Sequence, residues 1–113
     1  MAEAVIVEAV RAPVGKRNGG LSGVHPAELS AQVLNGLAQR AGIDPEIIDD
    51  VTWGCVMQAG EQALAIARTA VLTAGWPETV PGVTVDRQCG SSQQSVHFAA
   101  AGVVAGHYDA VVA

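Results

Sequence analysis

Short apolar and β-branched runs recur along the chain and predict strands. The four predicted strands are AVIVEAV (4–10), DVTWGCVMQ (50–58), GVTVD (82–86) and DAVVA (109–113). Their apolar positions are nearly continuous rather than alternating with polar ones, which is typical of a parallel sheet that is covered on both faces.

Helical patterns fill the segments between the later strands. Apolar residues recur every four positions in the first of them, at Leu29, Val33, Leu37 and Ala41. Pro26 suits the first position of this helix and Gly42 suits its carboxyl-terminal stop, so a helix is predicted over 26–41. Further helices are predicted over about 62–74 and from just after Cys89 to about 105, and residues 11–25 form a turn-rich loop.

Strands that alternate with helices predict an α/β fold, with a mostly parallel sheet, covering helices and right-handed crossovers. A length of 113 residues suits one modest domain, here residues 1–113. The last predicted strand ends the chain with little to cover it, so we expect a segment of a larger protein.

The composition excludes several classes of function. Half of the residues are hydrophobic but only 4% are aromatic, which predicts a core of Ala, Val, Ile and Leu. The net charge is −5 and the basic residues cluster only at 15–17, which argues against nucleic-acid binding. No run approaches the ~20 apolar residues of a membrane span, and no signal peptide is recognisable, so we expect a cytoplasmic protein. The two cysteines match neither a metal site nor a disulfide framework.

Cys89 is the main candidate for chemistry, because it lies where a predicted strand gives way to a predicted helix. The positive end of a helix dipole favours a thiolate, and free backbone N–H groups there can hold an oxyanion. We expect Cys89 within two residues of a helix start, after a central strand. Ser91 and Gln94 fit a capping box, and Gly90 would let a substrate approach the backbone. The alternative from the residues alone is a small buried hydrophobe.

The other cysteine and the histidines have plainer interpretations. Cys55 lies within an apolar run and is expected to be buried in mid-strand. His97 lies among apolar neighbours in the predicted third helix, and we expect a core or interface histidine rather than a base. His25 and His107 are expected in loops, with no partner that spacing would identify.

Three stretches of the chain resemble the N-terminal segment of the thiolase family, the acetyl-CoA acetyltransferases and 3-ketoacyl-CoA thiolases. They are RAPVGKRNGGLSG (11–23), GCVMQAGEQALAIAR (54–68) and VTVDRQCGSSQQS (83–95). Ala12 stands where the family usually has Thr or Ser, Asp86 where Asn is common, and Ser92 where Gly is common. The last two departures resemble a branch that acts on bulkier or degradative substrates, including steroid side chains or rings.

This resemblance implies the αβαβα layering of thiolases, of which the chain would form the first part of the N-terminal half. It implies an acyltransferase of fatty-acid β-oxidation and lipid metabolism in which Cys89 is the nucleophile. The reaction is cleavage of a 3-ketoacyl-CoA by CoA, or the reverse Claisen condensation, through an acyl-cysteine. Coenzyme A is then a substrate, no cofactor or metal is expected, and the protein is expected to form a homodimer or homotetramer.

The family's other catalytic groups, a histidine in a G-H-P motif and a cysteine in a C-x-G-G-G motif, would lie beyond residue 113, as would most CoA-binding residues. The resemblance therefore assigns only Cys89 here, and the isolated chain is expected to lack turnover. Two alternatives remain. One is a ketoacyl synthase of the same superfamily, which RAPVGK and GEQALAIAR make less fitting; the other is a non-catalytic α/β module with a vestigial Cys89.

Overall fold

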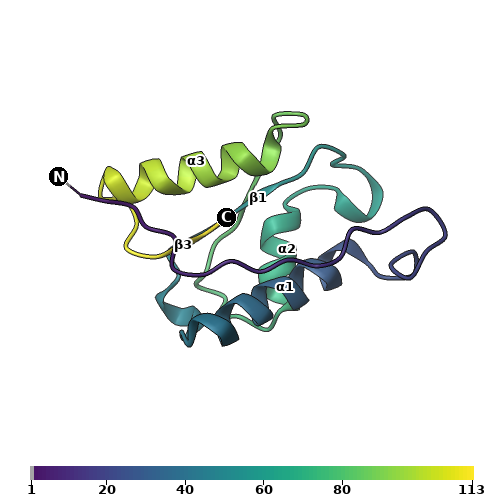
Figure 1. Cartoon of the computed structure of the whole chain (residues 1–113), viewed down its shortest axis with the longest axis horizontal. Coiled ribbons are helices and arrows are strands. Elements are labelled where there is room, and N and C mark those ends of the chain that lie inside the picture. Colours follow the sequence, from purple (N-terminus) through teal and green to yellow (C-terminus); the bar gives the residue numbers. More distant parts are fainter. Residues whose placement is uncertain (1) are drawn as a thin grey trace.

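A sheet of three parallel strands forms the middle layer of the computed structural model, which describes residues 2–113 (Figure 1). The strands are β1 (Asp50–Gly54), β2 (Val83–Val85) and β3 (Val111–Val112). Their order is β2-β1-β3, with Thr52 paired to Val83 and Val51 paired to Val112. The predicted parallel sheet is confirmed, although each strand is shorter than its apolar run.

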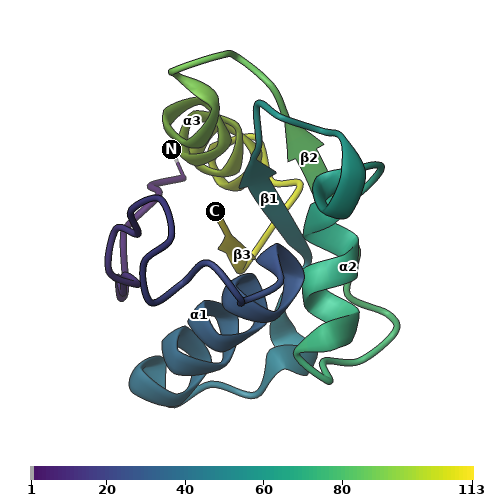
Figure 2. The same cartoon turned by 90° about the vertical axis from the view of Figure 1, so that its right-hand side faces the viewer.

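Helices cover both faces of this sheet. Helix α3 (Ser91–Val104) lies on one face, and α1 (Pro26–Ala41) and α2 (Ile66–Thr73) lie on the other, as Figure 2 shows. Two 3₁₀ turns, η1 (Pro45–Ile47) and η2 (Gly60–Gln62), complete the elements. The predicted α/β layering is therefore confirmed.

Helix α1 has the predicted bounds because both of its ends are capped. The Nδ1 atom of His25 accepts the N–H of Ala27 at 3.1 Å, so this histidine has a partner that the spacing did not reveal. Pro26 opens the helix, and Gly42 closes it with a left-handed φ of 66°. Helix α2 begins at Ile66, later than predicted, because η2 and the left-handed Leu64 (φ 62°) occupy the preceding residues.

The apolar core lies between the sheet and helices α1 and α2. Its largest fully buried apolar side chains are Leu34, Val51, Val71 and Val80. Trp76 joins this otherwise aliphatic cluster, and its indole N–H donates to the Oδ1 atom of Asn35 at 2.8 Å. The predicted aliphatic core is thus completed by one aromatic ring whose polar group is satisfied.

Helix α3 meets the opposite face of the sheet through small side chains. Its buried residues are Ser91, Ser95, Ala99 and Gly102. The hydroxyl of Thr52, in the middle of β1, donates to the backbone carbonyl of Ser95 at 3.0 Å. Small residues let the helix backbone approach the strand closely enough for this bond, which fixes α3 to the centre of the sheet.

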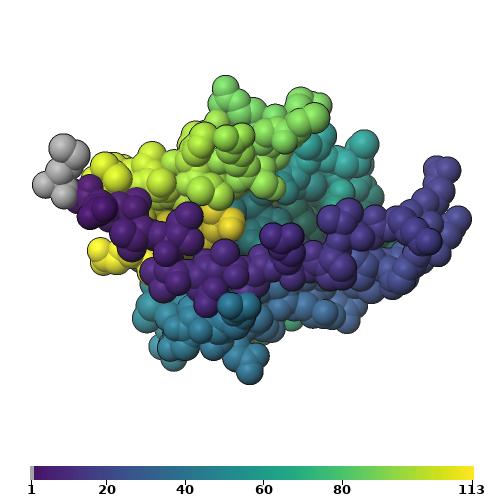
Figure 3. Space-filling view, viewed as in Figure 1, coloured from purple at the N-terminus to yellow at the C-terminus, as the bar shows by residue number. Residues whose placement is uncertain are grey.

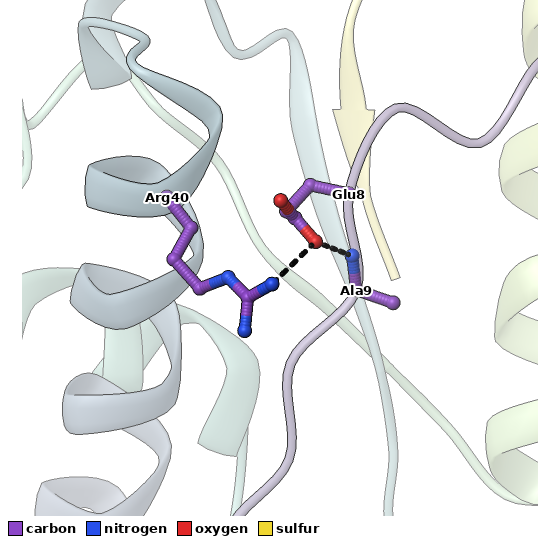
Figure 4. A network of polar contacts seen from close by, with 3 residues as sticks. All are labelled: Glu8, Ala9 and Arg40. Atoms are coloured by element: carbon purple, nitrogen blue, oxygen red, sulfur yellow. Dashed lines mark hydrogen bonds and ion pairs between the residues drawn. The ribbon is translucent and has the colours of Figure 1, made fainter.

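The predicted strand over 4–10 is wrong for the described structure. This segment is extended and crosses one face of the molecule (Figure 3), but it pairs with no strand among residues 2–113. Val5, Ile6 and Val7 are 70%, 82% and 78% exposed. A β-branched run favours an extended backbone, but a strand also needs a neighbouring backbone to bond with. Glu8 contacts α1 through Arg40, at 3.5 Å between Oε1 and Nη2 (Figure 4).

None of the helices in residues 2–113 is both long enough and apolar enough to span a bilayer.

Candidate functional site

Cys89 lies in the loop over residues 86–90, which joins β2 to the amino end of α3. Helix α3 begins at Ser91, two residues beyond Cys89, as predicted. The prediction of a preceding central strand is wrong, because β1 is the central strand of the described sheet and β2 lies at its edge. The loop leaves the sheet at the carboxyl ends of its parallel strands, where ligands bind in open α/β sheets.

The thiol of Cys89 is free and exposed, so the buried-hydrophobe interpretation is wrong. No side chain caps the amino end of α3, and Gly90 occupies the cap position. The N–H groups of the first helical turn and the helix dipole therefore favour an anion on this side of the sheet. Such a position suits both a thiolate and the oxyanion formed when sulfur attacks a carbonyl.

The predicted capping box is not formed. The hydroxyl of Ser91 is turned back onto the loop, where it accepts the N–H of Arg87 at 2.9 Å and donates to the carbonyl of Gln88 at 2.6 Å. The Oε1 atom of Gln94 accepts from the guanidinium of Arg87 at 2.6 Å instead of bonding to the cap. This guanidinium places a positive charge over the first turns of α3.

Gly54 sets the spacing between the end of β1 and the start of α3. A Cβ atom at this position would lie 2.5 Å from the backbone nitrogen of Ser92 and 2.7 Å from the carbonyl carbon of Ser91. Backbone atoms on both sides leave no flexible group to move aside. The absence of a side chain at Gly54 is therefore what lets α3 begin beside the central strand.

The prediction for Cys55 is wrong. It follows the last residue of β1 and is half-buried, with its Sγ atom 3.6 Å from the carbonyl oxygen of Met57. Its N–H still donates to Val85 at 2.9 Å, but the side chain of Gln58 bonds to its carbonyl at 3.1 Å. Strand β1 therefore ends at Gly54, although the apolar run predicted that it would continue, and a polar side chain bonds to the backbone beyond it.

The histidines and the larger hollows lie apart from the Cys89 loop. His97 and His107 are exposed, so a core role for His97 is wrong. A hollow of about 500 Å³ between α1 and α2 is lined by residues that include His25, Glu28 and Asn35, and by none from the loop. Within residues 2–113 no three His, Cys, Asp or Glu side chains gather as metal ligands.

Comparison with known proteins identifies the family. Residues 4–113 match the family described as "Thiolase, N-terminal domain". The chain belongs to the thiolase family. The thiolase-like fold is confirmed by the crystal structure of the Bacillus anthracis acetyl-CoA acetyltransferase, which superimposes with a TM-score of 0.92 at 40% identity over 98% of this chain.

Curated thiolases are similar over nearly the whole chain. The steroid 3-ketoacyl-CoA thiolase FadA6 of Mycobacterium tuberculosis is 54% identical over 100% of it, and a 3-ketoacyl-CoA thiolase of Saccharophagus degradans is 49% identical over 92%. The chain spans 28% and 27% of the length of these thiolases, and 28% of the Bacillus anthracis chain.

Proposed function

We propose that Cys89 is the acyl-accepting nucleophile of a thiolase that acts on 3-ketoacyl-CoA. The observation that carries the proposal is the placement of an exposed free thiol beside the uncapped amino end of a 14-residue helix, in a chain of this family. A buried thiol, or one in mid-helix, would have neither access to a substrate nor a neighbouring positive dipole.

The proposed chemistry proceeds in two half-reactions. The thiolate of Cys89 attacks the 3-keto carbon, and the bond between carbons 2 and 3 then breaks. Its electron pair passes to the enolate of acetyl-CoA, which takes up a proton, while the acyl group stays on Cys89 as a thioester. The thiolate of CoA then attacks this thioester, releases a shortened acyl-CoA and restores Cys89. The reverse sequence is a Claisen condensation.

Residues 2–113 supply the nucleophile and the electrostatic setting for this chemistry. The amino end of α3 favours negative charge at the sulfur and at the attacked carbonyl oxygen. We assign the base and the acid of the reaction to no residue of this chain. Coenzyme A enters as a substrate, and the proposal needs no metal or cofactor.

The substrate class that we propose is a bulky 3-ketoacyl-CoA in a degradative, β-oxidation-type pathway of lipid metabolism. The support is the 54% identity to a thiolase named for steroid substrates, together with Asp86 and Ser92 at positions where the family commonly has Asn and Gly. From the family resemblance, we also propose that the complete protein is a cytoplasmic homodimer or homotetramer.

Replacing Cys89 tests the proposal directly. In the complete protein, Cys89→Ala should reduce thiolytic cleavage of acetoacetyl-CoA to background, because no acyl-enzyme can form. Loss of the Mg²⁺-enolate absorbance of acetoacetyl-CoA measures the reaction. Cys55→Ala is the matched control and should retain most of the activity, because its thiol bonds only to a loop carbonyl. Turnover that survives Cys89→Ala would overturn the proposal.

A further inference from the structure

The Ser91 hydroxyl joins the two sides of the loop that carries Cys89. It accepts the N–H of Arg87 at 2.9 Å, on the side of β2, and donates to the carbonyl of Gln88 at 2.6 Å. Ser91 is itself only 5% exposed, so these bonds are partly shielded from competing water even though Arg87 and Gln88 are exposed. A single buried hydroxyl therefore bridges the chain before Cys89 and the helix after it.

The residue held in this way has a strained backbone. Gln88 adopts a left-handed φ of 50°, which residues with a side chain seldom adopt outside special sites. Its N–H donates to the Oδ1 atom of Asp86 at 2.8 Å, while its carbonyl accepts from Ser91. Gln88 is thus held at both of its backbone polar groups, and its carbonyl belongs to the peptide bond that leads into Cys89.

Ser91 is a rigid anchor because the helix backbone around it is fastened to the sheet. One turn further along α3, the backbone carbonyl of Ser95 accepts the hydroxyl of Thr52 in β1 at 3.0 Å. The backbone of Ser91 and Ser92 also lies directly against Gly54. The bonds from Ser91 to the loop therefore transmit the position of the central strand to Cys89.

We propose that Ser91 is a positioning residue that, together with Asp86, clamps Gln88 and so aims the Cys89 thiol along the amino end of α3. This inference rests on the proposed function, in which Cys89 must meet a carbonyl carbon in line with the oxyanion donors. The clamp acts on the direction of the sulfur and not on substrate contacts, because Ser91 is buried beneath the loop.

Loss of the clamp should therefore affect kcat more than KM. Without the hydroxyl, the N–H of Arg87 loses its partner and the carbonyl of Gln88 keeps only the longer bond from the Ser91 N–H, at 3.1 Å, so the left-handed conformation of Gln88 is held less firmly. Displacement of a reacting group by about 1 Å can lower a rate by about 100-fold, so Ser91→Ala should reduce kcat by about 10- to 100-fold. KM for CoA and for acetoacetyl-CoA should change much less.

The matched control is Ser95→Ala. Ser95 is 1% exposed and lies one turn further along the same helix, and its hydroxyl bonds within the helix rather than to the loop. In the complete protein, both variants should show a similarly small loss of melting temperature, and only Ser91→Ala should lose kcat. Alkylation of Cys89 by iodoacetamide, measured by peptide mapping with Cys55 as the internal reference, should slow only in Ser91→Ala.

Asp86 supplies a second variant at an exposed position, which keeps the test valid if Ser91→Ala does not fold. Asp86→Ala should lower kcat. Asp86→Asn should keep the wild-type kcat, because the amide oxygen of asparagine can accept the N–H of Gln88 in the same way. Wild-type kcat in folded Ser91→Ala or in Asp86→Ala, or equal losses in Ser91→Ala and Ser95→Ala, would overturn the clamp. The proposed function is tested independently of these variants, because it would be overturned if Cys89→Ala remained active.

Discussion

At the scale of single residues, Asp49 fastens the segment that leads into β3. Its Oδ2 atom accepts the N–H groups of Asp109 at 2.7 Å and Ala110 at 3.1 Å, and its own N–H donates to Ala110 at 2.8 Å. These hydrogen bonds lower the pKa of the Asp49 carboxyl below its ordinary value of 3.8. The bond from the backbone N–H of Ala110 has the larger effect, and that from Asp109 the smaller. The charged form therefore holds β3 in register with β1.

This shift predicts how stability depends on pH. Because the folded state has the lower pKa, the stabilisation is fully present above 3.8 and is lost as the pH falls through the folded-state value. Asp49→Asn should melt at a lower temperature than the wild type near neutral pH, and the gap should narrow as the pH falls, over the range in which the protein stays folded.

The control for this prediction is Glu78→Gln, at an exposed carboxylate. Glu78→Gln should have the same melting temperature as the wild type at each pH near and above neutrality. Equal melting of Asp49→Asn and the wild type near neutral pH, or a gap that stays constant with pH, would show that Asp49 does not act through its charge.

Single residues also mark the limit of what the sequence predicts about the site. Cys89 was found because a strand, a Gly and Ser loop and a helix follow one another in the sequence, and this order is local. The role of Ser91 was missed because a serine at a helix start ordinarily caps the helix. Its actual partners depend on how the loop closes, which no spacing shows. The predictions of a buried Cys55 and of a core position for His97 are wrong for a related reason, since apolar neighbours in sequence did not become neighbours in the core.

At the scale of elements, the close approach of β1 and α3 depends on Gly54. Gly54→Ala should destabilise the complete protein by about 1–3 kcal/mol, the usual cost of forcing a group into a packed interior. It should also lower activity, because the helix that follows Cys89 must move. Thermal or denaturant unfolding measures the first effect, and thiolysis of acetoacetyl-CoA measures the second.

Gly36 is the matched control for Gly54. It lies inside α1, and a Cβ atom there would meet nothing within 4 Å. Gly36→Ala should therefore stabilise the protein by about 0.5–1 kcal/mol, since alanine is the better helix former. Destabilisation by both substitutions, or by neither, would contradict the role given to Gly54.

Helix α1 was predicted to the residue because its signals, Pro26 and Gly42, are local. The predicted start of helix α2 is too early, since the left-handed Leu64 has no signature in sequence. The strand over 4–10 was predicted wrongly because pairing is a long-range property. Its apolar run favours an extended backbone, but the local sequence does not show which strand, if any, it would pair with.

At the scale of the whole molecule, the layers explain why the proposed site lies at one edge of the sheet. Parallel strands direct their carboxyl ends to one edge of the sheet, and the end of β1, the end of β2 and the start of α3 meet there. Apolar packing holds the sheet on α1 and α2, whereas α3 meets the sheet through small residues, two of which are serines. The same helix presents apolar side chains outward, at Val96, Phe98 and Val104.

The proposed function depends on acylation of Cys89, and mass spectrometry can detect this acyl group directly. The complete protein is mixed with acetoacetyl-CoA in the absence of free CoA, quenched in acid, digested and mapped by mass spectrometry. An acetyl thioester is expected on the peptide that contains Cys89, and none on the peptide that contains Cys55. An acetyl group on another residue, or turnover with no acylated Cys89, would contradict it.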